Sequence, residues 1–199
     1  MGTYNIITIG REFGSGGREV GLKLSERLGV PIYDKEILEE ASKKSGYTKE
    51  LFEKHDEKPT GSFLYSLALG TTGYGGGYQR PLILDIYLAQ FDTIRKLAKD
   101  GPGIFIGRCS DYVLADFPGS FHVFISSDME NRVSRIMQKM QVNEKKAKEI
   151  IIKADKDRAS FYNYYSNHIW GDSRHYDICL NTGKFGIDGA VDIIENCVK

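Results

Sequence analysis

A cluster of glycines and arginines near the amino terminus is the first group of residues that could do chemistry. The segment Gly10–Glu19 reads Gly-Arg-Glu-Phe-Gly-Ser-Gly-Gly-Arg-Glu. A β-branched run at residues 5–9 precedes it, and apolar residues at helical spacing follow it. Between a strand and a helix, consecutive backbone N–H groups and the helix N-terminus can wrap a phosphate chain. The pattern therefore predicts phosphate binding, and a glycine-rich turn that only reverses the chain is the alternative.

The cluster lacks side chains of the usual phosphate-binding loop. In the motif GxxxxGK[ST], the first glycine would stand at Arg11, the lysine at Gly17 and the Mg²⁺-binding hydroxyl at Arg18. Either Arg11 or Arg18 could supply the missing cation, because a guanidinium binds phosphate oxygens well. Ser15 or Glu19 could approach a metal ion. The sequence leaves open which of these residues does so.

Polar residues also follow two of the predicted strands. Asp34 comes after the strand at 30–33, and Arg108 and Asp111 come after the strand at 103–106. The carboxyl ends of parallel strands meet at one edge of a sheet, where Arg108 suits a bidentate phosphate contact. Asp34 could orient a Mg²⁺-bound water or an acceptor hydroxyl. The alternatives are an Arg108–Asp111 pair that fixes a loop, and Asp34 as a helix N-cap.

A strongly basic stretch lies in the second half of the chain. Between Arg132 and Arg158 there are nine lysines and arginines against four acidic residues. A cationic lid over a nucleotide polyphosphate would use such residues to neutralise charge on a transferring phosphoryl group. Charged helices are otherwise ordinary solvated faces, so this stretch has two interpretations.

The remaining candidates favour structural roles. The four histidines show no metal-ligand spacing, and Cys109 has no histidine partner that would make it a nucleophile. The aromatic run at residues 161–165 could stack a base, but packing inside the protein is the more common use of such a run. We therefore expect no metal or thiol chemistry from these groups.

Short strands and helices alternate along the chain. The predicted strands are 5–9, 30–33, 103–106, 121–125 and 176–180. Helices are predicted before Gly29, between Ile37 and Gly46, from Pro81 onward, from a Ser127/Glu130 capping box, from an Asn143 cap toward Tyr165, and over 187–194. The glycines between Gly70 and Gly77 predict a loop. This order implies an α/β three-layer fold with a five-stranded parallel sheet and a ligand at the carboxyl ends of the strands.

Composition excludes several classes of protein. The 199 residues, 41% of them hydrophobic, suit one domain with a core of its own. The 27 basic residues balance the 27 acidic ones, so we expect no nucleic-acid or membrane partner. No run approaches the roughly 20 apolar residues of a membrane span, and the start lacks a signal-peptide layout. Three scattered cysteines suit a reducing compartment, so we expect a cytoplasmic protein; the sequence leaves its oligomeric state open.

Four segments together resemble the cytidylate-kinase-like family of P-loop proteins. They read ITIGREFGSGGREVG, YDKEIL, IFIGRCSDYVL and YDICLNT, and the resemblance runs nearly end to end. It implies the three-layer nucleoside monophosphate kinase fold, with a core at 1–34, 82–128 and 174–199. It also implies a helical acceptor-binding segment at about 35–81 and a helical lid at about 129–173. Bacterial cytidylate kinases, with Mg²⁺, pass the γ-phosphate of ATP to CMP or dCMP, so ATP and Mg²⁺ are the implied cofactors.

The resemblance also assigns roles to individual residues. In those enzymes, the arginine that contacts the acceptor nucleotide is followed by an aspartate. Arg108 matches that arginine, and Cys109 stands in the place of the aspartate. The matching positions are Gly14, Ser15, Gly16, Gly17, Arg18 and Glu19 in the phosphate-binding loop, Arg132 and Arg135 in the helix that leads to the lid, and Lys153, Asp157 and Arg158 in the lid.

These residues support two main hypotheses of function. In the first, the protein is a small-molecule kinase, in which the amides of residues 14–18 hold the β-phosphate of ATP and Arg108 holds the phosphate of the acceptor. Arg18 or Arg11 then replaces the absent lysine, while Lys153 and Arg158 close over the γ-phosphate. In the second, the protein binds small-molecule nucleotides and signals by lid closure without turnover, which the absent lysine favours. A third hypothesis is an interaction protein whose glycine turns are only structural.

Overall fold

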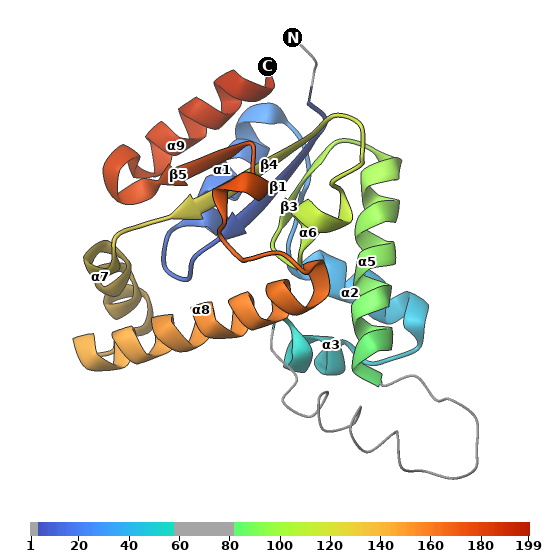
Figure 1. Cartoon of the computed structure of the whole chain (residues 1–199), viewed down its shortest axis with the longest axis horizontal. Helices are drawn as coiled ribbons and strands as arrows, with labels where there is room; N and C mark the ends of the chain where they lie inside the picture. Colours follow the sequence, from blue (N-terminus) through green and yellow to red (C-terminus); the bar gives the residue numbers. More distant parts are fainter. Residues whose placement is uncertain (1–3, 58–81) are drawn as a thin grey trace.

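The computed structural model describes residues 4–57 and 82–199. Its centre is a five-stranded sheet with the strand order β2-β3-β1-β4-β5 (Figure 1). The strands are β1 (Ile6–Arg11), β2 (Ile32–Tyr33), β3 (Gly103–Ile106), β4 (Ser120–Ser126) and β5 (Ile178–Asn181). Every neighbouring pair is parallel. The predicted parallel sheet is therefore confirmed, and β1, which leads into the glycine cluster, lies in its middle.

Helices connect the strands, and their ends follow local sequence signals. They are α1 (Gly17–Leu28), α2 (Lys35–Ser45), α3 (Lys49–His55), α5 (Leu82–Asp100), α6 (Ser110–Val113), α7 (Met129–Met140), α8 (Glu144–Ser166) and α9 (Thr182–Val198), with a 3-10 turn at Ser173–His175. Gly29 and Gly46 end α1 and α2 in the left-handed conformation that favours glycine. The side chain of Asn143 caps α8 by accepting a hydrogen bond from the backbone N–H of Lys146, 2.9 Å away.

Two local predictions need correction or completion. The capping box at Ser127 is wrong, because α7 begins after Asp128 and the backbone N–H of Ser127 donates to Glu12 Oε2 at 2.9 Å instead. Helix α3, which follows Thr48, escaped prediction because its seven residues are too few to show a period. The glycine loop at 70–77 and Pro81 lie outside the described residues.

The sheet separates two layers of helices, as the three-layer prediction requires. Ile7 and Ile9 belong to a buried cluster with residues of α1 and α9, while Ile6 and Phe105 belong to one with residues of α5 and α8. Alternation along β1 produces this division, because successive side chains of a strand point to opposite faces. Phe161, Tyr162 and Tyr165 of α8 pack in the second cluster, with the Tyr165 ring stacked on Tyr87, whereas Tyr164 of the same helix is exposed. The packing interpretation of that aromatic run is therefore confirmed.

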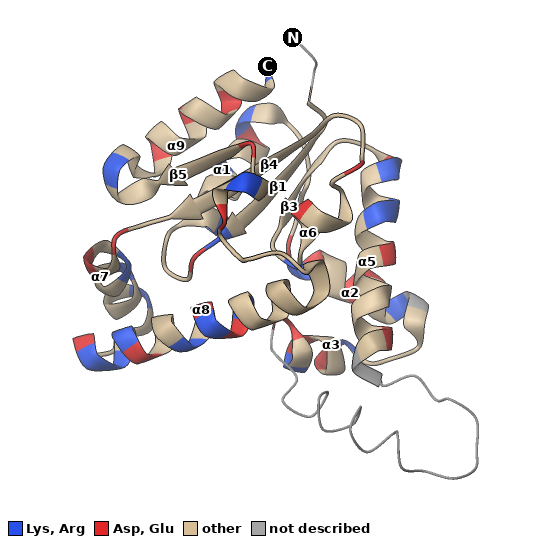
Figure 2. Ribbon diagram, viewed as in Figure 1, with Lys and Arg blue, Asp and Glu red and all other residues tan. Residues whose placement is uncertain are grey.

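A hairpin of two helices, α7 and α8, extends beside the carboxyl end of β4 (Figure 1). Its own small core contains Val133, Ile136 and Ile151, and Phe13 of the glycine cluster packs against it. Lysines and arginines recur along α8 (Figure 2). The hairpin thus brings the basic stretch next to the glycine cluster. In the described part of the chain, no helix combines the length and apolar character of a membrane span.

Candidate functional site

The glycine cluster forms a tight loop between β1 and α1. Gly14 and Gly16 have φ values of +81° and +84°, which only glycine adopts easily. A Cβ on Gly16 would lie 2.2 Å from Arg135 Nη1 and 2.4 Å from Ile187 Cδ1. The loop is fixed from inside, because Thr182 Oγ1 donates a hydrogen bond of 2.6 Å to the carbonyl oxygen of Ser15. Gly14 and Gly16 therefore allow the backbone to turn, and Gly16 also leaves room for Arg135 and Ile187 beside the loop.

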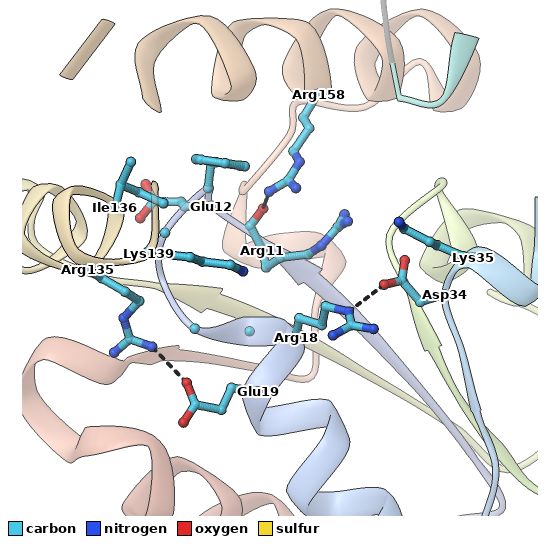
Figure 3. A pocket seen from close by; sticks show the side chains of 14 residues that line it. Arg11, Glu12, Arg18, Glu19, Asp34, Lys35, Arg135, Ile136, Lys139 and Arg158 are labelled. Atoms are coloured by element: carbon cyan, nitrogen blue, oxygen red, sulfur yellow. Dashed lines mark hydrogen bonds and ion pairs between the residues drawn. The ribbon is translucent and has the colours of Figure 1, made fainter. Parts of the chain in front are cut away.

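A cavity of about 680 Å³ opens between this loop, the start of α2 and the helices α7 and α8 (Figure 3). Its lining comprises Arg11, Glu12, Phe13, Gly14, Gly16, Gly17, Arg18, Glu19, Asp34, Lys35, Arg135, Ile136, Lys139 and Arg158. Six of these side chains are cationic and three are carboxylates, and the N-terminus of α1 points its first N–H groups the same way. The cavity is therefore suited to a polyanion.

Most of the residues singled out in the sequence meet at this cavity. They are Arg11, Gly14, Gly16, Gly17, Arg18, Glu19, Asp34, Arg135 and Arg158. In Figure 3, the side chains of Arg18 and Asp34 point toward one another, and Arg158 reaches down from α8 toward Arg11. The carboxyl ends of β1 and β2 bring the glycine loop and Asp34 together, since parallel strands end at one edge, while Arg135 and Arg158 come from α7 and α8.

Six predicted residues lie outside the cavity lining; besides Arg108, Asp111 and Arg132, these are Ser15, Lys153 and Asp157. Ser15 is buried, and its hydroxyl donates to the carbonyl oxygen of Glu12 at 2.9 Å, so it turns away from the position of a metal ligand. Lys153 is exposed on α8, while Lys139 of α7 lines the cavity instead. Asp157 is half-buried and also lies outside the lining. The direction of a side chain around a helix decides the last two cases.

Asp34 joins two arginines at the carboxyl end of β2. Arg18 Nε donates to Asp34 Oδ2 at 2.8 Å, and Arg108 Nη1 donates to Asp34 Oδ1 at 3.0 Å. Burial alone would raise the pKa of Asp34, but the two guanidiniums hold that pKa below its usual value. Asp34 stands at the N-cap position of α2, as the alternative expected, but its side chain makes no capping hydrogen bond and binds the two arginines instead. Asp34 is an ionised carboxylate at the cavity wall.

Arg108 lies behind Asp34 and not in the cavity wall. It is 2% exposed, and its Nη2 donates to Asp56 Oδ2 at 2.8 Å, while Nη1 also donates to the carbonyl oxygen of Ile106 at 3.1 Å. The Arg108–Asp111 pair considered from the sequence is therefore wrong. A buried guanidinium needs such partners, because an unpaired buried charge is costly.

Asp111 lies away from the cavity at the glycine loop. Tyr162 of α8 donates a hydrogen bond of 2.6 Å to Asp111 Oδ2, and burial raises the pKa of Asp111 to about 6. The residue lines a separate cavity of about 250 Å³ with His122, His168 and His175. Its predicted place beside the glycine loop is wrong, because the α6 turn directs it toward α8.

Helix α8 touches the glycine loop. Asp155 Oδ1 accepts a hydrogen bond of 2.7 Å from the backbone N–H of Phe13, and its other oxygen pairs with the buried Arg132. Arg158 Nη1 donates to the carbonyl oxygen of Arg11 at 3.1 Å, and its guanidinium carbon lies 5.4 Å from the centroid of the Phe13 ring. Sequence reasoning missed Asp155, although its position one helical turn before Arg158 is a usable signal.

Two further carboxylates, Asp56 and Glu57, escaped prediction. They follow α3 and bind Arg108 and Arg11, respectively. The surrounding sequence is a charged stretch without a strand or a glycine signal, so nothing local distinguishes them from surface residues.

The lining fits the phosphates of a nucleotide better than it fits a protein-held metal ion. The glycines leave a cradle that a Cβ would fill, since one on Gly17 would lie 2.6 Å from Arg11 Cβ. Within residues 4–57 and 82–199, no group of three His, Cys, Asp or Glu residues could hold a metal. Mg²⁺ needs only one or two carboxylates when phosphates and water complete its coordination, and Glu19 and Asp34 line the cavity.

Comparisons with known proteins agree with this geometry. The model of the cytidylate kinase-like family matches residues 6–184. An uncharacterized protein from Eubacterium ventriosum ATCC 27560 is 33% identical, with a TM-score of 0.73 and 97% of both chains covered. A comparison with curated proteins gives no match.

Two shikimate kinases share the fold at low sequence identity. The enzyme from Bacteroides thetaiotaomicron is 14% identical, with a TM-score of 0.55 and 97% of both chains covered. The enzyme from Acinetobacter baumannii, solved in complex with shikimate, is also 14% identical, with a TM-score of 0.51, over 98% of this chain and 92% of that one. The fold is thus that of the three-layer P-loop kinases, and the family match supports a kinase-like phosphotransferase. The chain belongs to the cytidylate kinase-like family.

Proposed function

We propose that this protein is an ATP-dependent phosphotransferase that moves the γ-phosphate of ATP to a small phosphorylated acceptor, with CMP and dCMP as the first candidates. The observation that carries the proposal is the cationic cavity between the glycine loop and the ionised Asp34. Phosphoryl transfer depends mainly on positioning and on stabilisation of negative charge, and this cavity offers both.

The donor end of the site is the glycine loop with the N-terminus of α1. Its backbone N–H groups hold the phosphate chain, and Arg18 takes over the role of the absent lysine. Arg18 suits this role because Asp34 fixes its Nε, which leaves both Nη groups for phosphate oxygens. Lys139 and Arg158 face the same space from α7 and α8. Bound Mg²⁺ neutralises part of the phosphate charge, and Glu19 and Asp34 are the residues that would hold it.

The acceptor end of the site begins at Asp34. In CMP the attacking group is a phosphate oxygen that is already ionised near neutral pH, so no proton has to be removed from it. The carboxylate of Asp34 instead fixes Arg18 and would help to hold Mg²⁺. Both Nη groups of the Arg108 guanidinium are paired, one with Asp34 and one with Asp56. Arg108 therefore binds a phosphate of the acceptor only after one of these two carboxylates releases its Nη group. Small-molecule nucleotides are the proposed partners of the whole site.

A nucleotide-binding sensor without turnover is the second candidate, since Gly17 stands where the catalytic lysine is expected. Calorimetric titration with ATP, with and without Mg²⁺, combined with an ATP-consumption assay over a panel of nucleoside monophosphates, separates the candidates. Binding with acceptor-dependent loss of ATP supports the kinase. Binding without turnover supports the sensor, and absence of binding contradicts both.

Substitution of Asp34 by asparagine tests the proposed acceptor end. Asp34→Asn keeps the size of the side chain but removes the negative charge that fixes Arg18, so we expect kcat to fall about 100-fold or more while ATP still binds. Asp92→Asn, which changes an exposed carboxylate of α5, is the matched control. An unchanged kcat in Asp34→Asn would exclude this role.

A further inference from the structure

Glu57 stands at the meeting point of three parts of the fold. Its Oε1 accepts hydrogen bonds from Arg11 Nη1 at 2.5 Å and from the backbone N–H of Arg108 at 2.9 Å. Its Oε2 accepts one from Arg158 Nε at 3.1 Å. The partners belong to β1, to the turn after β3 and to the lid helix α8. One carboxylate therefore connects the glycine loop, the sheet and the lid.

The two guanidiniums on Glu57 face the cavity on their other side. Arg11 and Arg158 both line it, and their side chains are only 11% and 16% exposed. Two buried guanidiniums in close proximity repel each other. Burial and the neighbouring charge of Arg11 together lower the pKa of Arg158 to about 10. A carboxylate that touches both of them offsets this repulsion and sets where they lie.

The contacts leave part of each guanidinium available. An arginine carries five N–H donors. Among the described residues, Arg11 gives one to Glu57, while Arg158 gives one to Glu57 and one to the carbonyl oxygen of Arg11. The remaining donors sit beside the glycine loop, at the wall where a phosphate chain would lie.

The backbone at Glu57 supports a specific role. Its φ is +48°, in the left-handed region that residues other than glycine avoid. A residue stays in this region when surrounding contacts hold it there, and such positions cluster at functional sites. At Glu57 this conformation occurs together with three hydrogen bonds to the carboxylate.

We propose that Glu57 is a positioning residue, which holds Arg11 and Arg158 together so that both guanidiniums bind the phosphate chain in the cavity. This inference rests on the proposed function in one respect, namely that the cavity binds a polyphosphate. It goes further because it assigns the alignment of Arg11 and Arg158 to one carboxylate, that of Glu57 in the segment after α3.

The test compares the thermal shift that inorganic pyrophosphate causes in the wild type and in three variants. Glu57→Gln removes the charge, Glu57→Asp keeps the charge on a shorter side chain, and Glu53→Gln changes an exposed carboxylate one turn earlier. We expect Glu57→Gln to bind pyrophosphate at least 10-fold more weakly, Glu57→Asp to lie between it and the wild type, and Glu53→Gln to match the wild type. If Glu57→Gln does not fold, the intermediate affinity of Glu57→Asp still supports the proposal.

Two outcomes would overturn this role of Glu57. One is a wild type whose melting temperature pyrophosphate does not change. The other is a Glu57 variant that melts earlier but keeps the full pyrophosphate affinity, which indicates a structural role only. ATP turnover is measured on the same samples. If pyrophosphate binding depends on Glu57 but no ATP is turned over, only the kinase proposal is contradicted. If ATP is turned over and both Glu57 variants keep the wild-type affinity for pyrophosphate, only the positioning role is contradicted.

Discussion

The arginines around the cavity differ in burial, and this difference separates their roles. Arg108 and Arg132 are buried and ion-paired, so they belong to the protein interior as much as to the site. The side chain of Arg18 is 57% exposed and its ion pair with Asp34 lies at the cavity wall. Exposed ion pairs contribute little to stability, whereas breaking a buried one costs about 3–5 kcal/mol.

Arg18→Ala is therefore expected to affect activity more than stability. Removal of one preorganised donor from a site of charge development commonly lowers kcat by about 100- to 1000-fold. We expect such a loss of kcat in Arg18→Ala with a nearly unchanged melting temperature. Arg108→Ala, by contrast, should lower the free energy of unfolding by about 3–5 kcal/mol. Steady-state kinetics and urea unfolding measure the two quantities.

Arg27→Ala is the control for the first variant, because Arg27 lies at the other end of α1 and pairs with Asp192 and Glu195. It should change neither kcat nor nucleotide affinity. If Arg18→Ala keeps the wild-type kcat, Arg18 does not replace the lysine, and Arg11 becomes the candidate.

At the scale of elements, α8 is attached to the rest of the molecule at two places. Asp155 and Arg158 contact the glycine loop in the middle of the helix, and Tyr162 contacts the buried Asp111 of α6 one turn further on. The first attachment is polar and borders the cavity, while the second lies in the aromatic cluster. Helix α8 is thus attached to α6 as well as to the glycine loop.

Asp111 makes the second attachment sensitive to pH. Burial raises its pKa from 3.8 to about 6, so the folded protein holds the proton more tightly than the unfolded chain does. The contribution of Asp111 to stability is therefore fully present below about pH 4 and is lost as the pH rises to about 6. A shift of this size corresponds to about 3 kcal/mol.

Urea unfolding of the wild type and of Asp111→Asn at several pH values tests this expectation. The difference in unfolding free energy between the two proteins should fall by about 2 kcal/mol from pH 4 to pH 7. Asp116→Asn, an exposed carboxylate after the same short helix, should show no such difference. A difference that stays constant between pH 4 and pH 7 would contradict the raised pKa.

For the whole molecule, the cavity lies where several parts of the chain meet. Its walls come from the loop after β1, the start of α2 and the hairpin of α7 and α8. Only the folded arrangement brings these residues together, so a ligand of the cavity binds the folded state and not the unfolded chain. Ligand binding must then raise the stability of the whole protein.

ATP at 100 times its dissociation constant should stabilise the protein by about 2.7 kcal/mol. For a chain of this size that corresponds to a rise in melting temperature of about 5–11 °C. Thermal unfolding followed by circular dichroism measures the rise, and adenosine, which lacks the phosphates, is the control ligand. A larger shift with adenosine than with ATP would place the binding energy on the base and contradict a phosphate-binding loop.

Local signals in the sequence were sufficient for most of the architecture. Alternating β-branched runs marked the strands, glycines marked the ends of α1 and α2, and Asn143 marked the start of α8. The convergence of Gly14, Arg18 and Asp34 followed from one rule, since parallel strands end at the same edge. These features depend on residues close together in the chain or on the direction of the strands.

What only the tertiary structure decided is the pairing of charges. Arg158 and Glu57 are 101 residues apart, and Phe13 and Asp155 are 142 residues apart. No periodicity connects such residues, because their contact depends on how α3 and α8 pack against the end of the sheet. The same packing turned Lys153 outward, Ser15 inward and Asp111 toward α8. The sequence by itself therefore determined the fold and the loop, while packing determined which charged groups face the cavity.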